Sequence, residues 1–100
     1  MAIVNVTEFA TVMTFAPGPV QIPSGEPLAT YDIAVGAGSV QGAVLNPATR
    51  LVRLNTDVTC RVRLGINPTA GAADSRFAAA QTEFWGVAAP GMRVACITSA

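Results

Sequence analysis

The stretch VTCRVRL at residues 58–64 is the clearest structural signal in this chain. Its apolar residues occupy the even positions, and Arg61 and Arg63 occupy odd positions between them. Successive side chains of a strand point to opposite faces of a sheet. The period of two therefore predicts a strand with one apolar face toward a core and one arginine-bearing face toward solvent or a partner.

Short patterns of the same kind recur on both sides of this stretch, separated by Gly and Pro turn signals. Val and Thr, which favour the pleated setting of a strand, together number 22 of the 100 residues. We predict about eight short strands, with residues 3–15 forming either one bent strand or two. The candidate strands span residues 3–15, 20–22, 28–35, 40–45, 51–54, 58–64, 82–87 and 92–98.

This spacing predicts one all-β domain over residues 1–100, a jelly-roll-like antiparallel β-sandwich. The window 74–80 is ambiguous, because Asp74 could cap a helical turn; we favour a loop with a short strand. Residues 1–6 are a candidate extended N-terminal arm that would pair with the sheet edge of a neighbouring molecule.

The charge composition argues against several classes of partner. The chain has six arginines, six acidic residues, no lysine and no histidine, so its formal net charge is zero. We therefore expect no nucleic-acid partner and no anionic membrane partner, because neither would meet a basic field. The beginning of the chain lacks the basic residues of a secretory signal, so we expect a soluble protein made in the cytoplasm.

Charged residues make up only 12% of the chain, about half the usual share. One interpretation is that the many alanines dilute the charge while Thr and Asn cover the surface. The interpretation that we favour is that neighbouring protein molecules cover much of the surface, because Ala and Thr also suit close contacts.

The composition also leaves little for catalysis. Without His or Lys, the usual general base, Schiff-base amine and imidazole ligand are missing, so we expect no enzyme activity, no cofactor and no metal. Cys60 and Cys96 are too few for a disulfide framework or a zinc site. We expect two buried thiols, although a disulfide remains open if their strands are neighbours.

Adjacent aromatic residues at 84 and 85 place one ring inward and one outward on a strand. The outward ring is a candidate contact anchor for a partner protein. The alternative is that one ring packs in the core and the other is covered by a loop. Trp85 or Tyr31 would also be the binding ring if the chain were a small carbohydrate-binding module.

Two segments of the C-terminal half resemble a known group of proteins. They are CRVRLGINPTA at residues 60–70, and TEFWGV at 82–87 followed by PGMRVACI at 90–97. The pattern of strand, G-x-N-P-T-A loop, strand, P-G turn and final strand is similar to small proteins encoded among the head and structural genes of tailed bacteriophages. The resemblance covers roughly residues 51–98.

This resemblance implies a virion component, and we expect a head decoration or cement protein on the capsid surface. Such a protein would contact the major capsid protein and would associate with itself, commonly as a homotrimer. A tail, baseplate or head–tail joining protein is the alternative within the same group.

The bond between Asn67 and Pro68 favours an extended loop that could present a fixed shape to a partner. We predict that the contacts with other proteins involve these two residues, one aromatic ring and the arginines of two strands: Arg50, Arg53, Arg61, Arg63, Asn67, Pro68 and Trp85. For the arginines, a solvated strand face is the alternative interpretation.

Overall fold

The computed structural model describes residues 2–15, 20–24 and 27–99, with side chains described for residues 2–10 and 27–99. All of its regular elements are β-strands. They are β1 (Ile3–Phe9), β2 (Thr11–Phe15), β3 (Val20–Ser24), β4 (Ala29–Ala34), β5 (Val40–Gln41), β6 (Leu51–Thr56), β7 (Cys60–Gly65), β8 (Ser75–Phe77), β9 (Thr82–Gly86) and β10 (Arg93–Thr98).

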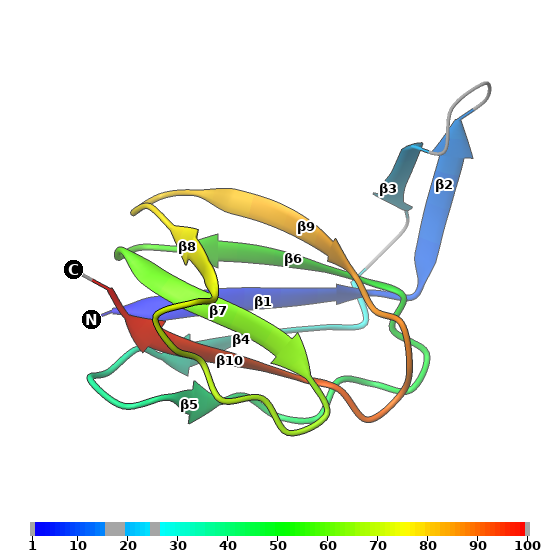
Figure 1. Ribbon diagram of the computed structural model, residues 1–100. Coiled ribbons are helices and arrows are strands. Elements are labelled where there is room, and N and C mark those ends of the chain that lie inside the picture. The colour runs from blue at the N-terminus through cyan, green and yellow to red at the C-terminus, as the bar shows by residue number, and fades with distance from the viewer. Residues whose placement is uncertain (1, 16–19, 25–26, 100) are drawn as a thin grey trace.

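Eight of these strands form two four-stranded antiparallel sheets that lie face to face (Figure 1). Sheet A has the order β4-β1-β6-β9, and sheet C has the order β5-β10-β7-β8. The predicted all-β sandwich is therefore confirmed, while the finer jelly-roll assignment stays a prediction. The remaining strands, β2 and β3, form a hairpin, and within the described residues neither pairs with a strand of the two sheets.

The core lies between the two sheets and draws side chains from both. Alternation along β7 is as predicted, since Cys60 and Val62 are buried and Arg63 is exposed. The buried apolar cluster consists of Val4, Val6, Ile33, Leu45, Val52, Leu54, Cys60, Val62, Phe77, Val94 and Cys96. The outer face of each sheet is therefore the face that can contact solvent or other molecules.

Two ambiguous windows are settled by the structure. Residues 3–15 form two strands, and β1 ends at Phe9 before the hairpin begins at Thr11. Residues 74–80 contain the short strand β8, so the loop and strand that we favoured are confirmed. The predicted strand at 40–45 is regular only over β5, although the Gly42 amide still donates to the Val94 carbonyl of β10 and the Leu45 amide to the Met92 carbonyl just before it.

The expectation of a free N-terminal arm is wrong for this structure. Residues 3–6 belong to β1, which pairs with β4 on one side and with β6 on the other. A strand that pairs on both edges within its own chain has no edge left for a neighbour. The segment that stands off the body is instead the β2–β3 hairpin, which projects beyond the end of β1 (Figure 1).

Candidate interaction surfaces

The exterior of sheet C brings four arginines together. Because Cys60 and Val62 face the core, Arg61 and Arg63 face outward from β7. The strand register places Arg76 of β8 directly opposite Arg61, and Arg93 of β10 two residues along from the partner of Arg63. We call Arg61, Arg63, Arg76 and Arg93 the arginine band, because they run across three adjacent strands.

The loop that joins β7 to β8 crosses the other half of this exterior (Figure 1). The Gln41 side chain donates hydrogen bonds from Nε2 to Asn67 Oδ1 at 2.8 Å and to the Pro68 carbonyl at 2.7 Å. The Ser39 hydroxyl accepts a further bond from the Ala70 amide at 2.9 Å. Pro68 is consequently buried within its own chain, and of the two predicted loop contacts only Asn67 is exposed.

Asp74 closes this loop and connects it to the arginine band. Its carboxylate accepts hydrogen bonds from the Gly71 amide at 2.8 Å and from Arg63 Nη1 at 3.1 Å, the latter also an ion pair. The Asp74 backbone carbonyl accepts a bond from Arg61 Nη1 at 2.8 Å. Two arginines predicted for intermolecular contacts therefore also fasten a loop of their own chain.

The exterior of sheet A carries mainly neutral polar side chains. Asn5 Nδ2 donates to Asp32 Oδ1 at 2.9 Å, and the hydroxyls of Thr7 and Thr30 lie 3.2 Å apart. The register places Arg53 between Thr7 and Phe84 on this face. Arg53 is half-buried there, and its Nε atom is buried without a hydrogen-bond partner.

The orientation of the two aromatic neighbours is resolved in favour of Phe84 as the outward ring. Phe84 is 50% exposed on the exterior of sheet A. Trp85 points inward, where its ring centroid lies 5.7 Å from that of Phe77 and its Nε1 donates to Glu83 Oε1 at 3.0 Å. Our choice of Trp85 as a contact residue is therefore corrected: the half-buried indole packs on the core, and Phe84 meets the outside.

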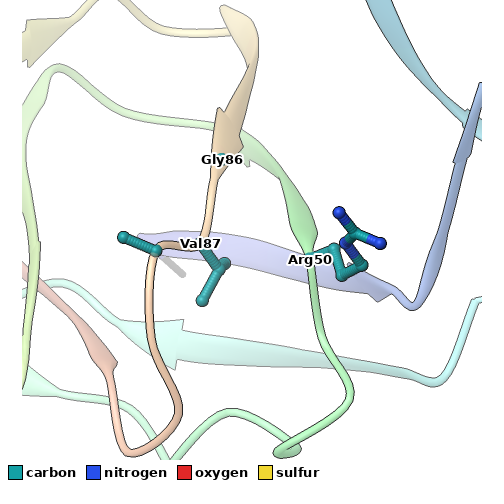
Figure 2. Close-up of a pocket in the computed structure, with 4 residues that line it drawn as sticks. Arg50, Gly86 and Val87 are labelled. Carbon is teal, nitrogen blue, oxygen red and sulfur yellow. The ribbon is translucent and has the colours of Figure 1, made fainter. Parts of the chain in front are cut away.

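Arg50 lies apart from the other predicted residues, just before β6. With Gly86, Val87 and Ala88 it lines an open hollow of about 400 Å³, and the Val87 amide donates to the Arg50 carbonyl at 2.9 Å. The Arg50 guanidinium extends away from Val87 (Figure 2). Because β6 and β7 belong to different sheets, the four predicted arginines do not form one cluster: Arg53 lies on sheet A, Arg50 lies just before the start of β6, and the other two lie on sheet C.

A buried carboxylate was missed in the sequence. Glu8 is only 2% exposed and accepts hydrogen bonds from the Asn46 amide at 2.7 Å and the Thr49 hydroxyl at 2.6 Å. The Tyr31 hydroxyl is close by but outside hydrogen-bond geometry; burial, together with the charge of Glu8, raises the pKa of Tyr31 to about 12. The signal was available, because Glu8 continues the inward phase of Val4 and Val6.

The two cysteines are buried free thiols on the neighbouring strands β7 and β10. Burial raises the pKa of both thiols, that of Cys96 to about 11. The register pairs Cys60 with Thr98 and Cys96 with Val62, so the cysteines are diagonal neighbours. Diagonal positions lie about 7–8 Å apart, beyond the usual span of a disulfide.

Within the part of the chain that the structure describes, no three His, Cys, Asp or Glu side chains gather in a way that could hold a metal ion. The same residues include no helix of the length and apolar character needed to cross a bilayer. Searches of protein-family models, curated proteins and solved structures found no match to this chain.

Proposed function

We propose that this chain is a structural protein of a tailed-phage virion, which decorates the head shell and stabilises it through protein–protein contacts. The observation that carries the proposal is the C-terminal resemblance, taken together with the place of its segments in the fold. They supply β7, β9 and β10 and the fastened loop after β7. The resembling pattern thus contributes strands to both sheets rather than forming an appendage.

The character of the surface supports a role in protein contacts. Only 12% of the residues are charged, and several large apolar side chains are exposed on sheet exteriors, edges and loops. Burial of these side chains against another protein would remove apolar surface from water. They are Leu28, Val40, Val44, Ile66 and Phe84.

The proposed partners are the major capsid protein and further copies of the same chain, with a homotrimer as the assembly that we propose. The protein would be made in the host cytoplasm and would end on the outer surface of the capsid. Light scattering coupled to size exclusion measures the mass of the free protein, and a value near three times 10.2 kDa is expected for the trimer.

The direct test is co-sedimentation with shells assembled from the capsid protein encoded with this chain. We expect saturable binding at a fixed ratio to capsid subunits, and shells that resist heat better when the protein is bound. A protein that stays monomeric and remains in the supernatant at all shell concentrations would contradict the proposal.

Copy number in the same experiment separates decoration from the alternative role in the tail or in head–tail joining. A decoration protein binds many sites over the shell, whereas a joining protein binds as one ring at a single vertex. The third alternative, carbohydrate binding through Trp85 or Tyr31, draws no support from the geometry, because both rings are half-buried against the core.

A further inference from the structure

The zero net charge of the chain hides an uneven distribution. The arginine band holds four of the six arginines, and Asp74 is the acidic residue that pairs with it. Four positive charges and one negative charge give this face a net charge of +3. Two arginines and five acidic residues remain for the rest of the chain, whose net charge is therefore −3.

The positive charge of this face is poorly compensated within the chain. Arg61 and Arg76 are registered directly opposite each other, an arrangement that destabilises a sheet through like-charge repulsion. Among the described residues, the one ion pair on this face joins Arg63 to Asp74, and the second carboxylate oxygen of Asp74 is taken by the Gly71 amide. Arg76 is exposed and Arg93 half-exposed, so both can reach a partner.

We propose that the arginine band is a docking surface for a carboxylate-rich patch on another protein. The guanidinium fork matches a carboxylate in shape and charge, and Arg63 already holds one in Asp74. Identification of that patch with the outer face of the shell protein rests on the function proposed above. The acidic character of the partner follows from the arginine band alone.

Two other occupants fit the charges less well. A nucleic acid carries its negative charge continuously along its length and would extend from this +3 face onto the −3 remainder of the molecule, whereas a carboxylate patch can be confined to the arginine band. A second copy would have to offer acids that, among the described residues, are already engaged within their own chain. Glu8 is buried and hydrogen-bonded, Asp32 accepts from Asn5, Asp57 from the Ile3 amide, and Glu83 from Gln81 and Trp85. An external acidic surface is the occupant that the charges favour.

The experiment compares three proteins for binding to a fluorescein-labelled oligoglutamate peptide, measured by fluorescence anisotropy. They are the unmodified chain, the double variant R76Q/R93Q and the control R50Q/R53Q, which removes the same charge from sheet A. The double variant spares Arg61 and Arg63, which fasten the loop. We expect R76Q/R93Q to bind about 2- to 20-fold more weakly and R50Q/R53Q to bind as the unmodified chain does.

Added salt should weaken the binding of the unmodified chain, because the contacts are exposed. Thermal unfolding of all three proteins checks that each one is folded; if R76Q/R93Q is not, the single variants R76Q and R93Q replace it. Absence of oligoglutamate binding, or equal losses in both double variants, overturns the inference. So does equally tight binding of an oligothymidylate of the same charge, or self-association that R76Q/R93Q abolishes.

The shell test separates this inference from the proposed function. If R76Q/R93Q co-sediments with shells as well as the unmodified chain does, the arginine band is not the docking surface and the proposed function stands. If the unmodified chain binds oligoglutamate through the arginine band but ignores shells, the acidic partner stands and the proposed function falls.

Discussion

The exteriors of the two sheets differ in how their polar groups are satisfied. On sheet A, Asn5 and Thr7 of β1 hydrogen-bond to Thr30 of the adjacent β4, and Thr7 also donates to Asn5 on its own strand. On sheet C, the arginine band leaves positive charge uncompensated, and a loop covers the remaining area. The neutral polar side chains of sheet A are thus hydrogen-bonded within the chain, although Arg53 Nε is not, whereas the exterior of sheet C is the face that we propose binds an acidic partner.

The core that supports both exteriors should respond most strongly to mutation. Phe77 is fully buried and packs against Trp85, so Phe77→Ala leaves a cavity between the sheets. We expect the free energy of unfolding to fall by roughly 3–5 kcal/mol, measured by urea denaturation. Phe84→Ala is the matched control, because half of that side chain is already exposed, and it should cost well under half as much. Similar losses for both would contradict the assignment of the inward and outward rings.

High pH should weaken the same core. Burial raises the pKa of Cys96 from 9.0 to about 11 and that of Tyr31 from 10.0 to about 12. The unfolded chain therefore loses these protons at a lower pH than the folded chain. The free energy of unfolding should be unaffected by these groups below pH 9 and should decline between about pH 9 and 12. The midpoint of urea denaturation, measured at each pH, follows this decline. A flat profile over that range would contradict the burial of these groups.

On sheet C, loss of the carboxylate that closes the loop should have a moderate effect. Asp74→Ala removes the acceptor for the Gly71 amide and the ion pair with Arg63. We expect a loss of about 1–2 kcal/mol together with faster hydrogen exchange of the Gly71 amide. Asp32→Ala on sheet A removes one exposed hydrogen bond and should cost less than half as much. Equal effects would show that the loop does not depend on Asp74.

On sheet A, the side-chain hydrogen bonds among Asn5, Thr7 and Thr30 can be removed at Thr7, the most buried of the three. Thr7 is 5% exposed, and Thr7→Val keeps its branched shape while removing the hydroxyl. We expect a loss of about 1 kcal/mol in chemical denaturation, since the bonds to Asn5 and Thr30 are lost. Thr30→Val, at an exposed site, is the control with the smaller expected effect.

The smallest expected effect has the opposite sign. Arg76→Gln relieves the repulsion with Arg61 and should stabilise the free protein by about 0.2–1 kcal/mol at low salt. The gain should shrink in concentrated salt, which screens surface charges. Arg50→Gln is the control, because no arginine is registered opposite Arg50, and thermal unfolding at two salt concentrations compares the pair. A destabilised Arg76→Gln protein would mean that the arginine band is compensated within the chain.

Local periodicity predicted the sandwich well, because alternation is a property of single strands. The pattern at residues 58–64 gave both the strand and its inward face, and Glu8 could have been recognised as buried from its phase with Val4 and Val6. Residues 74–80 were less clear from the sequence, because Asp74 could also cap a helical turn; the loop and short strand that we favoured there agree with β8.

The surfaces could not be assembled from local patterns, because they depend on which strands become neighbours. Arg76 and Arg93 lie on the same face as Arg61 because β8 and β10 both pair with β7. This pairing of separate segments cannot be read from the pattern within any one of them. Alternation along the strand placed Phe84 and Trp85 on opposite faces of the sheet. It could not tell which ring faced inward, because both rings are apolar. The burial of Pro68 depends on Gln41, a partner 27 residues away.

The diagonal placement of Cys60 and Cys96 keeps the two thiols from forming a disulfide with each other in the folded protein. Two buried thiols that cannot reach each other neither need an oxidant to complete the fold nor lose a bond to a reductant. As long as the fold keeps these thiols buried and diagonal, the covalent state of the pair does not depend on the redox potential of the solution. No covalent bond joins β7 to β10, so hydrogen bonding and core packing hold these two strands together.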